Sequence, residues 1–139
     1  MKLAPGAPGA RIIGIGEHRP TRVVTNDEIC KDIDSSDEWI RQRTGIITRA
    51  RAPKDVSALD LATDAGREAI ANSGVPASDI DLVIVGTVSN VKTTPSIAAV
   101  VADRVGANPA AAYDSNAACA GFSYAVTQAD ALIRAGAAH

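Results

Sequence analysis

The sequence of 139 residues carries a formal net charge of −2, has a pI near 5.6 and contains only 3% aromatic residues. Its length suits one domain or part of one. Because Lys and Arg are scattered singly and no apolar run approaches the roughly 20 residues of a membrane span, we expect neither a nucleic-acid nor a membrane partner. Cys30 and Cys119 form neither a metal-ligand spacing nor a disulfide framework, which favours a reducing, cytoplasmic location.

The chain begins with a stretch rich in Pro, Gly and Ala. Residues 1–9 are therefore expected to be a flexible leader, with the folded domain over residues 10–139. The short β-branched run Arg11–Gly16 predicts a buried strand. Its two glycines also match part of a dinucleotide-binding fingerprint, but Arg19 stands where the third glycine should be, so we prefer the strand.

Two capping-box patterns, Thr25–Glu28 and Ser35–Glu38, each predict the start of a short helix. The second helix continues through Arg43, and Gly45 can end it in a left-handed conformation. Trp39 and Arg43 are four residues apart, so they share one face of that helix. The pair is equally consistent with a surface cation–π contact and with a platform for a planar, phosphate-bearing ligand.

Acidic residues and histidines are the side chains of this sequence that could bind a metal or act as catalytic groups. Asp34, Asp37 and Glu38 gather at the start of the second helix, where carboxylates more often stabilise the helix dipole, and no metal site is expected. His18 and His139, the two histidines of the sequence, are expected to be surface residues.

The middle of the chain predicts an extended segment, a long helix and a strand. Residues 46–49 should be extended, and Ser57 should cap a helix that ends at Gly74. The continuously apolar run Leu82–Val85 is typical of a strand covered on both faces, as in parallel sheets.

The last part of the chain again alternates between helices and strands. Thr94 and Pro95 resemble an N-cap and a first helical residue, with Gly106 as terminator. Ala111–Asp114 predicts another strand, and a striped helix follows from about residue 119 to residue 135. Strands that alternate with helices predict an α/β fold, whose ligands lie where a strand ends and a helix begins.

Cys119 lies at such a point, within the stretch Asp114–Phe122. A thiol that opens a helix faces unpaired N–H groups and the positive end of the macrodipole, which favour the thiolate. Small neighbours leave room for a substrate. The alternative is a buried structural cysteine, since free Cys is among the most buried residue types.

The motifs Asp34–Ile40, Arg43–Ile46 and Ala117–Phe122 resemble those of β-ketoacyl-ACP synthase III. This thiolase-fold family starts fatty-acid synthesis by condensing an acyl-CoA with malonyl-ACP. The resemblance extends in order over residues 10–139 and includes Arg22–Asn26.

The resemblance implies roles for five positions. Cys119 matches the nucleophile that accepts the acyl group, with its own N–H as an oxyanion donor. Trp39 and Arg43 match residues that hold coenzyme A, with the ring against adenine, and Ser35 adds a polar contact to the base. Thr94 aligns with a loop residue that enters the partner subunit's acyl pocket in a homodimer. Because some members have Phe there, Thr94 predicts room for longer or branched acyl chains. No metal or redox cofactor is implied.

The resemblance also implies a three-layer α/β/α fold with a mixed sheet, of which this chain is the N-terminal half without the fifth strand. The family's catalytic His and Asn lie in the other half and have no counterpart here. We therefore expect the chain alone to be poorly stable and inactive in condensation. Two other functions stay open: a related acyltransferase that acts on an alcohol or amine, and a non-catalytic acyl-CoA-binding or dimerisation fragment.

Overall fold

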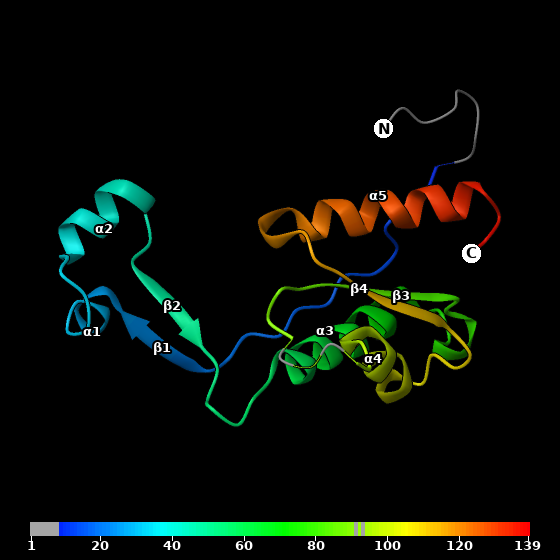
Figure 1. The fold of residues 1–139 in the computed structure, drawn as a ribbon, viewed down its shortest axis with the longest axis horizontal. Coiled ribbons are helices and arrows are strands. Elements are labelled where there is room, and N and C mark those ends of the chain that lie inside the picture. Colours follow the sequence, from blue (N-terminus) through cyan, green and yellow to red (C-terminus); the bar gives the residue numbers. More distant parts are fainter. Residues whose placement is uncertain (1–8, 91, 93) are drawn as a thin grey trace. The chain divides into compact units, whose positions relative to one another are not determined.

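A computed structural model describes residues 9–90, 92 and 94–139, which form two compact units (Figure 1). Unit 1 contains the described residues up to Glu17 together with Ala58–His139, and unit 2 is His18–Ser57. No helix in the described part of the chain is both long and apolar enough to cross a membrane.

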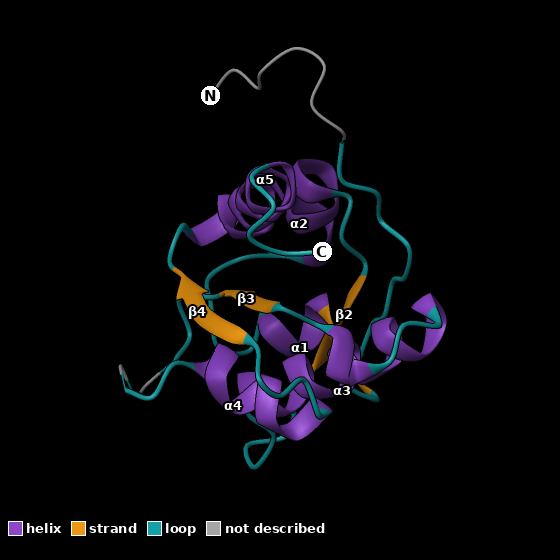
Figure 2. Cartoon of the chain, turned by 90° about the vertical axis from the view of Figure 1, so that its right-hand side faces the viewer, coloured by secondary structure: helices purple, strands orange, loops and turns teal. Residues whose placement is uncertain are grey.

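Unit 1 has three layers around a pair of parallel strands (Figures 1 and 2). Strand β3 (Leu82–Gly86) pairs with β4 (Ala111–Ser115) in continuous parallel register. Helix α4 (Ile97–Val105) packs on one face with α3 (Ala58–Ser73) beside it, and α5 (Gly121–Arg134) covers the other face. The predicted three-layer α/β/α arrangement is confirmed. The strands of the described residues form two separate pairs, one parallel and one antiparallel, and not the single mixed sheet that was expected.

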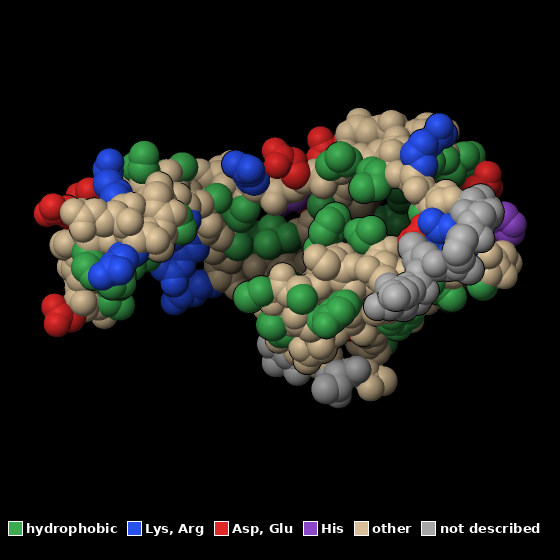
Figure 3. Space-filling view, turned by 90° about the horizontal axis from the view of Figure 1, so that it is seen from above, with side chains coloured by type: hydrophobic (Ala, Val, Ile, Leu, Met, Phe, Trp, Pro, Cys, Tyr) green, Lys and Arg blue, Asp and Glu red, His purple; other side chains and the backbone are tan. Residues whose placement is uncertain are grey.

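The two faces of this strand pair are packed differently. On the α4 side, Ile97, Ala98 and Val101 are buried, and small side chains bring the helix close to the strands. On the other side, Phe122 at the start of α5 is 75% exposed. An open apolar groove of about 360 Å³ runs between α5 and β3, and Figure 3 shows hydrophobic side chains on this side of unit 1. The groove's apolar lining consists mainly of Ile80, Leu82, Ile84, Phe122, Ala125, Val126, Ala129 and Ile133.

All three glycines predicted to end helices take the left-handed conformation, including Gly45, which ends a helix of unit 2. Gly74 follows α3 with φ of 70°, and Gly106 follows α4 with φ of 82°. The helix that precedes Gly74 begins at Ala58, directly after Ser57. A 3-10 turn, Ala77–Asp79, then leads into β3.

The predicted start of α4 was wrong. Thr94 and Pro95 lie in a bend before the helix, and Ser96 is the N-cap, with its Oγ accepting a hydrogen bond from Ala99 N–H at 3.2 Å. The N–H groups of the two preceding helical residues donate to Asp114 on β4, at 2.9 and 2.8 Å. A carboxylate distant in sequence therefore fixes where this helix begins.

The strand predicted at Arg11–Gly16 is also absent from the described structure. The backbone of this run instead contacts side chains of α3. Asn72 Nδ2 donates to Ile15 O at 2.8 Å, and directly after the run the Glu17 N–H donates to Glu68 Oε2 at 2.6 Å. The glycines lie so close that a Cβ on Gly14 would overlap the backbone of α3. Gly14 and Gly16 thus let this segment pack closely on α3, and no pairing with another strand of the described residues makes it a β-strand.

Unit 2 consists of an antiparallel strand pair and two short helices. β1 (Arg22–Thr25) pairs with β2 (Thr48–Arg51), while α1 (Asn26–Ile29) and α2 (Asp37–Thr44) lie between them in sequence. The caps support both predicted helix starts, because Thr25 Oγ1 accepts from Glu28 N–H at 3.2 Å and Ser36 Oγ from Trp39 N–H at 3.1 Å. The second cap is Ser36 and not Ser35, one residue later than the predicted box.

Candidate active site

Cys119 lies on an exposed turn between β4 and α5. The prediction that it opens the helix needs correction, because Cys119 is the middle residue of a 3-10 turn, Ala118–Ala120, and α5 begins at Gly121. Ala118 has φ of 44°, a left-handed conformation that costs a residue with a Cβ roughly 1 kcal/mol or more. This strained, tight turn presents the thiol at the surface of unit 1, where a substrate can reach it.

Two contacts hold the elements that flank this turn. At the end of β3, a Cβ on Gly86 would come within 2.9 Å of the Gly121 carbonyl carbon, so only glycine allows this approach. On the next strand, Tyr113 Oη donates to Gln128 Oε1 on α5 at 2.5 Å. The start of α5 thus lies against the end of β3, and the middle of α5 is hydrogen-bonded to β4, so both strands hold the helix that follows Cys119.

Asp114 is a residue of this region whose role the sequence did not reveal. Besides the two N–H groups of α4, its carboxylate accepts a hydrogen bond from Asn90 Nδ2 at 3.3 Å. It thus joins the strand that leads to Cys119 with the loop before α4. A single acid at the end of an apolar strand was the available signal, but its partners lie too far away in sequence to be identified.

Thr94 is exposed and belongs to that loop in unit 1. Its part in an acyl pocket stays a prediction.

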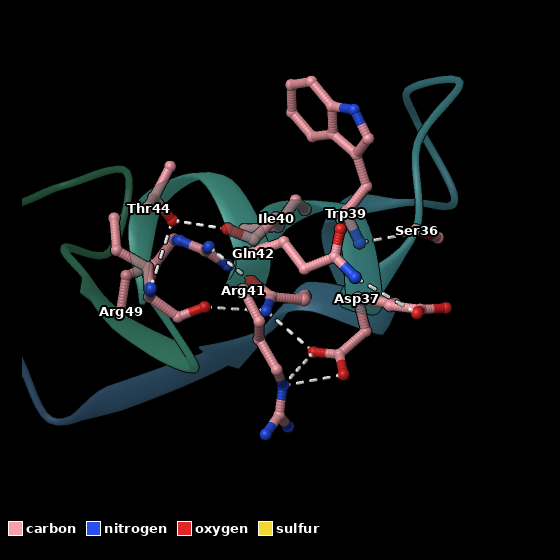
Figure 4. A network of polar contacts seen from close by, with 11 residues as sticks. Ser36, Asp37, Trp39, Ile40, Arg41, Gln42, Thr44 and Arg49 are labelled. Atoms are coloured by element: carbon pink, nitrogen blue, oxygen red, sulfur yellow. Dashed lines mark hydrogen bonds and ion pairs between the residues drawn. The ribbon is translucent and has the colours of Figure 1, made fainter.

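Trp39 and Arg43 in unit 2 form the pair that their spacing predicted. The Arg43 Cζ atom lies 5.9 Å from the centroid of the Trp39 ring, within cation–π range, and the ring is 55% exposed. Figure 4 shows the ring pointing away from the polar network on the other side of α2. A flat ring that is both accessible and next to a cation can stack on a planar group and attract an anion.

Ser35 borders the same surface. With Ile33, Asp34, Ser36 and Trp39 it lines an open hollow of about 560 Å³. Its Oγ is shielded from solvent and has no hydrogen-bond partner among the described residues. A contact from Ser35 to a ligand in the hollow would need the hydroxyl to rotate outward, which would also give this buried oxygen a partner.

The acids at the start of α2 contact protein groups. Asp37 accepts hydrogen bonds from Arg41 and from Asn26, and these lower the pKa of the Asp37 carboxyl below its ordinary value of 3.8. Glu38 accepts from Gln42 Nε2 at 3.2 Å. Within the described ranges, no three His, Cys, Asp or Glu side chains are grouped so that they could hold a metal ion.

Both histidines are exposed, as predicted. His139 Nδ1 lies 3.2 Å from Asp81, and its side chain is 89% accessible. The predicted site residues therefore fall into two sets, with Cys119 and Thr94 in unit 1 and Trp39, Arg43 and Ser35 in unit 2.

Comparisons with known proteins show the family to which the chain belongs. The family model described as "Thiolase, N-terminal domain" matches residues 41–139. The chain is 60% identical over 126 residues to a beta-ketoacyl-(acyl-carrier-protein) synthase III of Kocuria rhizophila, and 49% identical over 138 residues to that of Streptomyces glaucescens. These matches cover 91% and 99% of this chain but 36% and 41% of the relatives, so the chain spans about two fifths of their length.

Solved structures give the same picture. The priming beta-ketosynthase from the R1128 polyketide biosynthetic pathway superposes with a TM-score of 0.90 at 38% identity, covering 99% of this chain and 41% of that one. The 3-oxoacyl-(acyl-carrier-protein) synthase III of Aquifex aeolicus superposes with a TM-score of 0.88 at 39% identity, covering 94% of this chain and 42% of that one.

Proposed function

Because the chain belongs to the family of thiolase N-terminal domains, we propose that it supplies the acyl-accepting part of a β-ketoacyl-ACP synthase III that starts fatty-acid synthesis. The observation that carries the proposal is the exposed Cys119 thiol on a strained turn between β4 and α5. Strain of this kind persists where the surrounding structure enforces it, and it is common at reactive residues. The similarity to relatives with this name supports the same assignment.

In the first half-reaction, the deprotonated Sγ of Cys119 attacks the thioester carbonyl carbon of an acyl-CoA. The bond from that carbon to the coenzyme A sulfur breaks, coenzyme A leaves as a thiolate and takes a proton from solvent, and Cys119 keeps the acyl group. We expect the Cys119 N–H to donate to the oxyanion that forms on the way.

In the second half-reaction, malonyl-ACP loses CO₂, and the released electron pair forms the carbon–carbon bond to the acyl carbon. Cys119 then leaves as a thiolate, and β-ketoacyl-ACP is the product. In this proposal, the residues of this chain carry out only the transfer of the acyl group to Cys119.

Coenzyme A would be held by Trp39 and Arg43. Adenine can stack on the exposed indole ring, and the neighbouring guanidinium can attract a phosphate. Ser35, at the edge of the hollow beside Trp39, would contact the base after its hydroxyl rotates outward.

The test is covalent labelling. Incubation with radiolabelled acyl-CoA should leave about one acyl group on each chain, and Cys119→Ala should abolish it. Cys30→Ala, which removes the other cysteine of the sequence, is the matched control and should label normally. Binding of acyl-CoA without transfer would instead favour a non-catalytic fragment. Onward transfer to an alcohol or amine would favour the related acyltransferase.

Thr94 is proposed to set the acyl-chain preference across a homodimer interface. Its side chain is smaller than Phe and would leave more room in the acyl pocket, so branched or longer acyl-CoAs should be accepted. Comparing labelling rates for a series of acyl-CoAs tests this, and Thr94→Phe should shift the preference towards acetyl. Strict acetyl selectivity of the parent protein would contradict the proposal.

A further inference from the structure

The helix that carries Trp39 and Arg43 has little to hold it. Helix α2 has eight residues, and Ile40 is its one buried residue. A helix this short is not stable by itself in water. Its orientation must therefore come from contacts with the rest of unit 2.

Asn26 provides three such contacts at once. Its side chain is 1% exposed, and its Nδ2 donates to Asp37 Oδ1 at 2.7 Å and to Ile46 O at 2.8 Å. Its Oδ1 accepts from Arg49 Nη2 at 2.6 Å. One amide thus joins the first residue of α2, the chain just beyond the end of α2, and strand β2.

The chemistry of these partners requires an amide. Two of them are acceptors and the third is a cationic donor, and asparagine alone among side chains of this length offers two N–H donors together with an acceptor. Turning the amide over would place its oxygen against the oxygens of Asp37 and Ile46 and its NH₂ against a guanidinium. The orientation is therefore fixed by its surroundings.

Removal of this amide would leave buried groups unpaired. Arg49 Nη1 is already buried without a partner among the described residues, so losing Oδ1 would strip a second nitrogen of the same guanidinium. Unpaired buried donors are costly, and those next to a charge most of all. Asp37 would keep its partner Arg41, as Figure 4 shows, but would lose its link to the rest of the unit.

We propose that Asn26 is a positioning residue for the coenzyme A platform, fixing α2 so that the Trp39 ring and the Arg43 guanidinium face the nucleotide. This inference rests on the proposed coenzyme A site. Asn26 itself is not proposed to contact the ligand.

Binding of coenzyme A, followed by calorimetry, tests the inference without relying on Cys119. Pantetheine, which lacks the adenine nucleotide, serves as the second probe. Asn26→Asp keeps the size and the acceptor for Arg49, but sets a carboxylate against Asp37. We expect it to bind coenzyme A about tenfold more weakly than the parent, with pantetheine binding unchanged.

Two further variants make the result specific. The exchange Asn26→Asp with Asp37→Asn restores the hydrogen bond between residues 26 and 37 with donor and acceptor swapped, but leaves Ile46 O without its donor. It should therefore bind coenzyme A more tightly than Asn26→Asp alone, though more weakly than the parent. Asn72→Asp makes the same chemical change at an exposed asparagine of unit 1 and should change neither affinity. Because Trp39 is the one tryptophan of the sequence, its fluorescence reports changes in the surroundings of its ring on α2.

Parental coenzyme A affinity in a folded Asn26→Asp variant would overturn the inference. So would an exchange variant that regains its melting temperature but binds coenzyme A no more tightly than Asn26→Asp, or failure of both variants to fold, since Asn26 would then hold unit 2 as a whole. Trp39→Ala tests the proposed coenzyme A site separately from the role of Asn26. If that variant binds coenzyme A as the parent does, the platform itself is wrong, whatever Asn26 does.

Discussion

Around Cys119 the backbone is held by direct contact between glycines, whereas around Trp39 it is held by hydrogen bonds between side chains. Gly86 and Gly121 leave no space for a methyl group between β3 and α5. Asn26 and Asp37 instead connect elements that need not touch closely. The first region should therefore be sensitive to added volume, and the second to changes of donor, acceptor or charge. This difference suits the proposed roles, because a nucleophile must be placed within a fraction of an ångström whereas a binding platform needs only to present the right face.

The strongest way to test the comparison is Gly86→Ala. The added methyl would meet the backbone of Gly121, which cannot move aside cheaply, so we expect a loss of about 3 kcal/mol in unfolding free energy and slower acylation of Cys119. Gly66→Ala is the control, because a Cβ there meets Val105 only at 3.6 Å and the position is inside α3. It should stabilise by about 0.5–1 kcal/mol. Equal melting temperatures for the two variants would contradict the volume argument.

Asp114 lies near Cys119 but acts through hydrogen bonds. It therefore tests whether close packing alone holds the backbone around Cys119. Asp114→Ala removes the acceptor for two N–H groups of α4 and for Asn90, and should cost about 2 kcal/mol. Asp114→Asn keeps one acceptor oxygen and should cost less. Urea unfolding gives the free energies, and amide exchange at Ile97 should quicken in the Ala variant. A larger loss for Asn than for Ala would refute this account.

Neighbouring serines provide a smaller and sharper test of the second region. Ser36→Ala removes the N-cap of α2 and should cost about 1 kcal/mol. Ser35→Ala removes an oxygen that has no hydrogen-bond partner among the described residues, and should change stability by less than about 0.5 kcal/mol. Guanidinium unfolding followed by Trp39 fluorescence measures both. Similar losses for the two variants would mean that the cap is not what holds this helix.

The smallest effect is expected from pH. Hydrogen bonds from Arg41 and Asn26 lower the pKa of Asp37, so its contribution to stability is complete above the ordinary value of 3.8 and is lost as the pH falls through the lower pKa of the folded state. Arg41→Gln should raise the pKa of Asp37 towards 3.8, as carboxyl NMR would show. The ion pair is largely exposed, so its contribution should be small and should weaken with salt. If Asp37 has the same titration midpoint in Arg41→Gln as in the parent, the hydrogen bond from Arg41 is not the main cause of the lowered pKa of Asp37.

Much of the fold could be predicted because the signals were local. Hydrophobic runs marked β3 and β4, glycines marked the ends of α3 and α4, and the Trp39–Arg43 spacing gave the cation–π pair. Each of these features depends on residues within a few positions of one another.

The features that escaped prediction depend on distant partners. The start of α4 is set by Asp114, which a local cap pattern at Thr94 cannot show. The run Arg11–Gly16 has the composition of a strand, but a strand also needs a neighbouring chain to pair with, and side chains of α3 meet its backbone instead. The role of Asn26 was hidden for the same reason, since within its capping box it looks like an ordinary residue of a helix start.

The open groove between α5 and β3 has a practical consequence for all of these measurements. Environment-sensitive dyes, whose emission rises in apolar surroundings, can bind an accessible hydrophobic channel of about 360 Å³ on a folded protein. Dye-based thermal shift curves would then begin bright and could fall on heating, hiding the transition. Circular dichroism and the intrinsic emission of Trp39 avoid this artefact. Loss of dye signal on addition of a protein that covers the groove would turn the same property into an assay for its occupant.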